Sequence, residues 1–357
     1  MTAPEARFTG ARGQLIRTLF PDGVPRLWCP LLTHYTEAPA GGVQLDRARL
    51  RAHLASMQPW VKGFLIPGST GEGWDMTDDE IRELLEVMAG EVRAIGGTIL
   101  AGVLKTDGEA VRASIAGVVD WARRFTGTDD TAEALAKSAI CGFTVCPPSG
   151  EALGQDVIRA TLAEVLGTGL PVALYQLPQV TKNEMTPDTL RALAAAHPNF
   201  ILFKDTSGTD GAAKSGFRDV FLVRGAEGNY AGHIAEGGGA YDGFLLSTAN
   251  CFGRQLAEMM DDMAEGNREA AEDVSEVLTA ICATLFPLAG QVGYGNAFTN
   301  ANKAMDHIMA HGADALNVAP PLLHSGIRLP ADLIRAASEE LARHGLAPEK
   351  GYLGAGL

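Results

Sequence analysis

Between about residue 24 and residue 250 the chain alternates short apolar runs with longer amphipathic stretches. Short apolar runs are typical of buried strands, and apolar residues spaced by three or four are typical of helices. Eight strands alternating with helices over about 225 residues favour a closed barrel over an open sheet. We therefore expect the α/β class and a (β/α)8 TIM barrel. The predicted strands are residues 26–33, 63–67, 98–103, 142–146, 172–176, 201–204, 220–224 and 243–247; the predicted helices between them are 45–57, 78–94, 108–125, 156–166, 186–196, 210–217 and 230–236.

Helices alone are predicted on either side of this pattern. Residues 8–20 form a predicted helix that would cover the bottom of the barrel. After residue 251 helices are predicted at 254–266, 269–286, 299–311 and 330–344, and 126–137 looks like an insertion before the fourth strand. The expected organisation is an N-terminal helical leader (1–23), the barrel (24–250) and a C-terminal helical region (251–357). The sequence Thr77-Asp-Asp-Glu80 has the pattern of a helix-starting capping box.

Composition excludes several classes of protein. A net charge of −14 and a pI near 5.0 argue against a nucleic-acid-binding surface, which needs clustered Lys and Arg. No run reaches the roughly 18 apolar residues of a membrane span, and the first residues lack the apolar segment of a signal peptide. The five cysteines are odd in number and include no CxxC pair, which favours reduced thiols. We expect a cytoplasmic protein.

One predicted strand ends in a lysine. In the run Ile201-Leu-Phe-Lys204, strand alternation puts Lys204 on one face with Leu202. Lysine is rarely buried without a partner, and a desolvated amine loses its proton more easily and can attack a carbonyl carbon. The preceding strand carries Tyr175 at the matching place. A surface lysine at a strand end would give the same short pattern, but a barrel brings the two strand ends together at its active face.

The second predicted strand leads into Gly68-Ser-Thr-Gly-Glu72. Glycines on both sides of two hydroxyl residues allow a tight bend whose N–H groups and hydroxyls can hold a small carboxylate. An ordinary structural turn has the same composition. The lysine, the tyrosine and this bend together predict chemistry on a 2-oxo acid.

These residues resemble the dihydrodipicolinate synthase/N-acetylneuraminate lyase superfamily. The segments Gly68–Glu72, Tyr175-x-x-Pro178 and Lys204-Asp-Thr-Ser-Gly208 look like its three signatures, in its order, and 242–250 matches its eighth strand. The resemblance covers roughly residues 24–345. It implies a Schiff base between Lys204 and pyruvate or the 2-oxo end of a substrate. The other implied roles are proton relay by Tyr175, carboxylate binding by Ser69 and Thr70 with Gly68, and pocket lining by Gly225 and Leu245.

The chain also departs from the synthases. Cys146-Pro-Pro-Ser149 replaces their Pro-Tyr-Tyr context, so a second tyrosine is missing. Val180 occupies the place of an arginine that reads a distal carboxylate. Both changes argue against lysine biosynthesis, and the Ser69-Thr70 order resembles the lyases of sugar acids more than the synthases.

Three further residues are candidates for contact with the distal half of a substrate. His34 follows the first strand, Glu227 follows the seventh and Ser247 ends the eighth. Each also has a purely structural interpretation, as a hydrogen-bonded loop or strand-end residue. The histidines are scattered, so no metal site is predicted.

The predicted function is aldol cleavage or condensation of pyruvate with an aldehyde, on a 2-oxo-3-deoxy sugar acid type of substrate. One alternative is a dehydratase that uses the same imine. Others are a dihydrodipicolinate synthase-like enzyme and a catalytically silent 2-oxo acid binding protein. The covalent imine on Lys204 would replace any cofactor. The expected partners are a small 2-oxo acid and further copies of the chain, as a dimer or tetramer, with no nucleic acid and no membrane.

Overall fold

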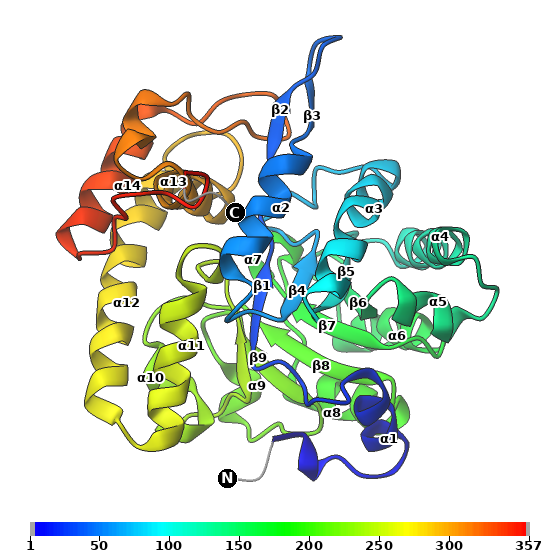
Figure 1. Ribbon diagram of the computed structural model, residues 1–357. Coiled ribbons are helices and arrows are strands. Elements are labelled where there is room, and N and C mark those ends of the chain that lie inside the picture. The colour runs from blue at the N-terminus through cyan, green and yellow to red at the C-terminus, as the bar shows by residue number, and fades with distance from the viewer. Residues whose placement is uncertain (1–3, 355–357) are drawn as a thin grey trace.

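The computed structural model describes residues 4–354 and contains a closed parallel barrel (Figure 1). The order around it is β1-β10-β9-β8-β7-β6-β5-β4, so the strands follow one another around the ring. The barrel strands are β1 (Leu27–Pro30), β4 (Gly63–Ile66), β5 (Thr98–Val103), β6 (Ile140–Val145), β7 (Val172–Gln176), β8 (Phe200–Asp205), β9 (Phe221–Arg224) and β10 (Gly243–Leu245). All eight coincide with predicted strands, which confirms the predicted fold class. The small antiparallel pair β2 (Tyr35–Glu37) and β3 (Val43–Leu45), which projects beyond the barrel, was not predicted.

Helices cover the outside of the barrel. They are α1 (Gly10–Leu19), α2 (Arg47–Met57), α3 (Asp78–Ala94), α4 (Gly108–Thr126), α5 (Thr131–Lys137), α6 (Gln155–Leu166), α7 (Pro178–Thr181), α8 (Pro187–Ala196), α9 (Gly211–Lys214), α10 (Tyr230–His233), α11 (Ala249–Glu265), α12 (Arg268–Gly290), α13 (Ala297–His311) and α14 (Ala331–Arg343). The predicted capping box starts α3: the Thr77 hydroxyl accepts from the Glu80 N–H, and the Glu80 carboxylate accepts from the Thr77 N–H. The predicted insertion contains α5, and the predicted helix at 230–236 ends as α10 before a separate 3₁₀ turn at Ala235–Gly237.

The N-terminal helix closes the bottom of the barrel, as predicted. Phe8, Ile16 and Phe20 pack into one apolar cluster with inward-facing strand residues such as Leu100 and Leu202. The helix is also tied to the barrel by a hydrogen bond, which the Arg12 guanidinium of α1 donates to the carbonyl of Phe200 at the start of β8. The barrel interior is therefore filled at this end, and the opposite end is left for polar groups.

Four helices of the C-terminal region, α11–α14, gather on one side of the barrel (Figure 1). By length and composition alone, α12 is the one helix of the described chain that could cross a membrane, and 33% of its apolar window is buried. It packs against α11, α13 and α14. Because β10 ends at Leu245 and α11 begins at Ala249, barrel and helices are joined closely. The division into three domains at residues 23 and 250 stays a prediction.

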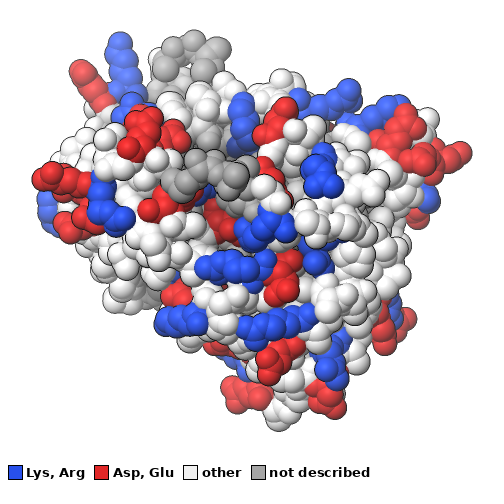
Figure 2. Space-filling model, turned by 90° about the horizontal axis from the view of Figure 1, so that it is seen from below, with Lys and Arg blue, Asp and Glu red and all other residues white. Residues whose placement is uncertain are grey.

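On the face seen in Figure 2, Lys and Arg side chains are interspersed with Asp and Glu. Ion pairs elsewhere in the structure include Arg7 with Asp242 and Arg26 with Glu236. Interspersed charges of both signs lack the one-signed field that draws nucleic acid to a surface.

Candidate active site

Lys204 and Tyr175 lie side by side inside the barrel. They are register partners on the adjacent parallel strands β8 and β7. Both are buried, with 4% of Lys204 and 2% of Tyr175 exposed. The Lys204 Nζ lies 4.0 Å from the centroid of the Tyr175 ring. The expected convergence of the two strand ends is thus present in the structure.

The surroundings of Lys204 disfavour its charge. Burial lowers the pKa of the amine from 10.5 to about 7, while the nearby acidic groups of Cys146, Glu227 and Cys29 act in the opposite direction. A large part of the population therefore holds an uncharged, nucleophilic amine near neutral pH. Burial also raises the pKa of the Tyr175 phenol, with a smaller contribution from Cys146, so the phenol stays protonated and can donate.

Gly225 follows β9 and leaves room for the lysine side chain. A Cβ atom at this position would lie 2.7 Å from the Lys204 Cε and 2.3 Å from the Thr206 Oγ1. Real Cβ atoms do not approach so closely, so a larger residue would displace the lysine. Leu245, at the end of β10, belongs to the apolar cluster that fills the barrel interior. The expected lining of the substrate pocket by these two residues stays a prediction.

The bend after β4 lies next to the tyrosine. Ser69 Oγ is 3.5 Å from the Tyr175 hydroxyl oxygen and accepts a 2.8 Å hydrogen bond from the Trp74 indole N–H. Thr70 is buried, and the Gly68 carbonyl accepts from the N–H groups of residues 71 and 73, which closes the turn. The structure therefore places Ser69, one of the predicted carboxylate-binding residues, beside Tyr175.

Glu72, at the end of this bend, has a structural partner that the sequence did not reveal. Its carboxylate pairs with the buried Lys303 of α13 and accepts a 2.8 Å hydrogen bond from the His324 N–H. The Lys303 ammonium also donates to the Leu322 carbonyl. The carboxylate loop is thus tied to the C-terminal helices.

Glu227 and Ser247 lie together but are bonded to protein groups. The Ser247 hydroxyl donates to Glu227 Oε1 at 2.6 Å, and Thr248 donates to both carboxylate oxygens through its N–H and hydroxyl. The Tyr230 hydroxyl donates a further bond to Oε2. Four donors thus surround this carboxylate, which is close enough to Lys204 to raise the pKa of the amine against the effect of burial. Substrate contact by either residue stays a prediction.

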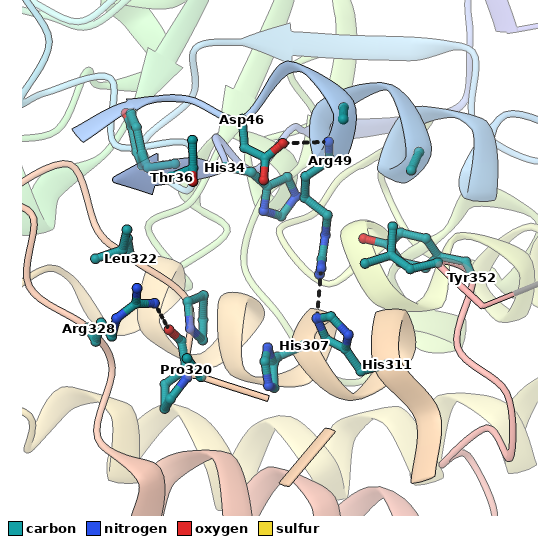
Figure 3. A pocket seen from close by; sticks show the side chains of 16 residues that line it. His34, Thr36, Asp46, Arg49, His307, His311, Pro320, Leu322, Arg328 and Tyr352 are labelled. Carbon is teal, nitrogen blue, oxygen red and sulfur yellow. Dashed lines mark hydrogen bonds between the residues drawn. The ribbon is translucent and has the colours of Figure 1, made fainter. Parts of the chain in front are cut away.

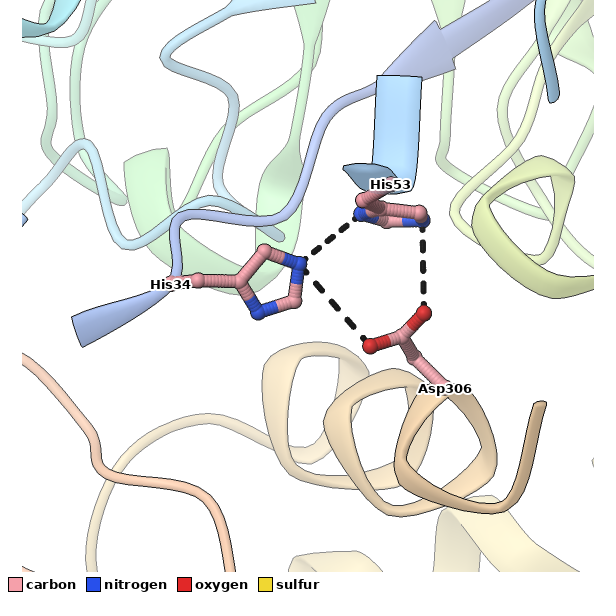
Figure 4. Close-up of side chains that lie close together, drawn as sticks. All are labelled: His34, His53 and Asp306. Atoms are coloured by element: carbon pink, nitrogen blue, oxygen red, sulfur yellow. Dashed lines mark hydrogen bonds and ion pairs between the residues drawn. The ribbon is translucent and has the colours of Figure 1, made fainter. Parts of the chain in front are cut away.

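His34 belongs to a separate cluster with His53 and Asp306 (Figure 4). The His53 Nε2 faces the Asn250 carbonyl at 2.9 Å and so carries the proton, which leaves Nδ1 to accept from the His34 Nε2 at 2.9 Å. Burial lowers the pKa of both imidazoles, in agreement with neutral rings. Within residues 4–354 the His34 side chain has no hydrogen bond or ion pair with the other predicted site residues.

This cluster offers three metal-ligating atoms within 4.8 Å of one another. Both carboxylate oxygens of Asp306 are already bonded, one to the Arg49 guanidinium at 2.6 Å and the other to the Tyr352 hydroxyl at 2.9 Å. The guanidinium supplies the compensating positive charge that an ion would otherwise bring. No sequence pattern predicts the cluster, because its members come from the β1–β2 connection, α2 and α13.

His34 also lines a pocket of about 640 Å³ between α2, α13 and the C-terminal segment (Figure 3). Its wall includes Arg49, His311 and Tyr352, and it includes neither Lys204 nor Tyr175. The buried amine of lowered pKa beside a protonated phenol makes the Lys204 site the better candidate for the active site.

Apolar side chains pack around Tyr175. They include Cys146, at the start of the segment in which a second tyrosine was expected from the synthases. Cys146 packs in one cluster with Leu104, Tyr175, Leu177 and, at its edge, Trp74. Lys182, in the loop after β7, is exposed and its ammonium donates to the Gln179 carbonyl. The Asn183 amide donates to the carbonyls of residues 148 and 150 and so joins two loops. These two side chains are thus occupied with the protein itself.

Sequence comparisons match this chain to the dihydrodipicolinate synthetase family and its members. The sequence model of the dihydrodipicolinate synthetase family matches residues 158–292. A 4-hydroxy-tetrahydrodipicolinate synthase from Xanthomonas axonopodis pv. citri is 28% identical over 240 residues, which is 65% of this chain and 71% of that protein. One from Mycolicibacterium paratuberculosis is 28% identical over 279 residues, 75% of this chain and 83% of that protein.

Solved structures share the fold. A dihydrodipicolinate synthase superposes with a TM-score of 0.69 at 16% identity, over 90% of this chain and 100% of that one. YagE from E. coli K12, a member of the dihydrodipicolinic acid synthase family solved with pyruvate, gives 0.67 at 18% identity, covering 90% and 99%. CdNal from Clostridium difficile, solved with mannosamine, gives 0.67 at 15% identity, covering 90% and 98%. These matches make the chain similar to the dihydrodipicolinate synthase family, in sequence over residues 158–292 and in fold over about nine tenths of its length.

Proposed function

We propose that this enzyme cleaves or forms the carbon–carbon bond between C3 of pyruvate and an aldehyde carbon, on a 2-oxo-3-deoxy sugar acid type of substrate. The observation that carries the proposal is the buried amine of Lys204, with its pKa lowered to about 7, beside the Tyr175 phenol. Burying a lysine destabilises the fold, and a catalytic role for the amine explains why this one is buried.

The reaction begins when the neutral Lys204 amine attacks C2 of the 2-oxo acid. Loss of water gives a protonated imine, which draws electrons from the C3–C4 bond. A base removes the proton of the C4 hydroxyl, the bond breaks, and the aldehyde leaves an enamine. The enamine takes a proton at C3, and water releases pyruvate and the free amine. Tyr175, 3.5 Å from Ser69, is the group that we assign to the proton transfers.

The carboxylate of the 2-oxo acid would bind at the bend after β4. Ser69 and Thr70 supply hydroxyl groups there, and Gly68 allows the tight turn. Gly225 and Leu245 would line the pocket beside the reacting carbon, and no cofactor would be needed because the imine itself accepts the electrons. Glu227 and Ser247 would face the hydroxyls of the distal half.

Reduction with borohydride in the presence of pyruvate tests the imine. We expect a mass increase on the peptide that contains Lys204 in the wild-type protein and none in Lys204→Ala. Unmodified Lys204 at saturating pyruvate would instead identify a silent binding protein. Product analysis with 2-oxo-3-deoxy sugar acids then tests the reaction: pyruvate and an aldehyde support the proposal, whereas loss of water without release of pyruvate contradicts it and identifies a dehydratase.

The proposal extends to the assembly and the location. We infer a homo-oligomer, a dimer or tetramer, in the cytoplasm, by analogy with the family. Light scattering on the purified chain tests the assembly, and a monomer at micromolar concentration would contradict it.

A further inference from the structure

The bend that would hold the substrate carboxylate presents two unused N–H groups. Within residues 4–354, the main-chain N–H groups of Ser69 and Thr70 have no hydrogen-bond acceptor. The following N–H groups are used by the turn itself: those of residues 71 and 73 donate to the Gly68 carbonyl at 3.1 and 3.0 Å, and that of Glu72 donates to the Ser69 carbonyl at 3.1 Å. Two free donors beside two hydroxyls form the kind of concavity that binds an anion.

The carbonyl groups of the same two residues also accept hydrogen bonds from the start of α13, namely from its N-cap residue Asn296 and from Thr299. The Asn296 side-chain amide donates to the Ser69 carbonyl at 3.2 Å. The Thr299 hydroxyl lies 3.2 Å from that carbonyl oxygen and 3.0 Å from the Thr70 carbonyl oxygen. Thr299 is completely buried, and its hydroxyl in turn accepts from the Asn296 amide at 2.7 Å. The two side chains therefore act as one hydrogen-bonded unit.

This arrangement fixes where the free N–H of Thr70 points. The Ser69 carbonyl and the Thr70 N–H belong to one planar trans peptide, in which the two groups point in opposite directions. When α13 holds the carbonyl, the N–H must point away from α13. The Ser69 hydroxyl of the same bend lies 3.5 Å from the Tyr175 hydroxyl, and we infer that the Thr70 N–H faces the space beside that phenol.

A buried ion pair fixes α13 relative to the bend. Lys303 lies one helical turn after Thr299 and pairs with Glu72, three residues beyond Ser69. The two charged side chains are 1% and 3% exposed. A pair this deeply buried resists displacement, because separating it would leave an uncompensated charge in the interior.

We propose that Thr299 and Asn296 are positioning residues that orient the Thr70 N–H for the carboxylate of the 2-oxo acid. The inference rests on the proposed function, since it assumes that the bend binds this carboxylate. It assigns a part in substrate binding to the C-terminal helical region, which lies about 230 residues away along the sequence and outside the barrel. The two side chains touch the loop and not the substrate.

Calorimetric titration with pyruvate in a Lys204→Ala background tests the proposal without requiring imine formation. Thr299→Val removes the donor with little change in shape, and we expect pyruvate binding to weaken roughly 5- to 50-fold. Thr299→Ser restores the hydroxyl and should bind within about twofold of the background protein, a difference of a few tenths of a kcal/mol. Thr189→Val removes a buried threonine hydroxyl in α8, remote from the bend, and should leave binding unchanged.

A second variant guards against misfolding. Asn296→Asp keeps the side-chain oxygen that accepts from the Thr299 N–H at 2.8 Å and so keeps the cap of α13, but it loses the amide donor. It should also weaken binding while far-UV circular dichroism stays unchanged. In the protein with Lys204 intact, borohydride trapping should need more pyruvate for half-saturation, with a similar maximum.

Equal pyruvate affinity in the Thr299→Val, Thr299→Ser and background proteins would overturn the positioning role. Absence of borohydride trapping of pyruvate on Lys204 in the wild-type protein would overturn the proposed function instead, so the two failures are distinguishable. Weaker binding in Thr299→Val that Thr299→Ser does not rescue would indicate a packing effect, and this too would reject the hydrogen-bond role.

Discussion

Replacing Lys204 by methionine should make the protein more stable while it abolishes imine formation. Methionine has a similar length, carries no charge and suits the aromatic surface of Tyr175, whose ring centroid lies 4.0 Å from the amine. In the wild-type protein the folded state must either desolvate an ammonium group or release its proton. The variant removes that cost. Enzymes commonly sacrifice stability in this way at a reactive group.

The magnitude follows from the lowered pKa. A pKa of 10.5 in the unfolded chain and about 7 in the fold means that the unfolded state binds more protons between these two pH values. Stability therefore rises with pH across this window, and the cost is greatest at its lower end. The difference corresponds to roughly 4 kcal/mol at pH 7 and less than about 1 kcal/mol at pH 10.5. The stabilising effect of Lys204→Met should shrink accordingly.

Urea unfolding at pH 7 and pH 10 measures this effect. Tryptophan fluorescence and far-UV circular dichroism should give coincident transitions, so that a single free energy of unfolding applies. Lys182→Met, in an exposed loop position, is the matched control and should change stability by less than about 0.5 kcal/mol. A Lys204→Met protein less stable than the wild type at pH 7, or with the same gain at both pH values, would refute the reasoning.

Three more predictions concern other parts of the molecule. Tyr175→Phe should slow turnover by roughly two to four orders of magnitude while retaining borohydride trapping at Lys204, because it removes a proton donor and not the nucleophile; a near-normal steady-state rate would contradict this role. Lys303→Met should lower the free energy of unfolding by about 3–5 kcal/mol, because it leaves the Glu72 charge buried and unpaired. Adding Glu72→Gln should recover most of this loss, and urea unfolding of both variants measures the two effects. The free energy of unfolding should fall as the pH drops below about 6.5, because burial lowers the pKa of His34 and His53 and the unfolded chain then binds more protons than the folded one. Thermal unfolding at pH 5 and pH 7 measures this fall, and His53→Gln should make the fall smaller.

The sequence predicted the barrel because strand and helix periodicities are local properties. Each apolar run was visible by itself, and eight of them in alternation leave few arrangements that bury every strand. Strand alternation also indicated the inward direction of Lys204, and adjacency of consecutive parallel strands predicted its approach to Tyr175. The short elements β2, β3 and α7 were missed because three or four residues carry too little periodicity.

The proposed chemistry could thus be inferred from one strand end and its neighbour, since barrel geometry alone brings such residues together. Other features depended on contacts across the chain. Lys303, Thr299 and Asp306 looked like ordinary polar positions of an outer helix, yet all three are buried and bonded to distant segments. No local pattern encodes which carbonyl or carboxylate a side chain will meet after some 230 residues of intervening chain. Local sequence therefore determined the barrel and its lysine, whereas tertiary packing decided how the C-terminal helices support the site, because hydrogen bonds and ion pairs between distant segments exist only in the folded chain.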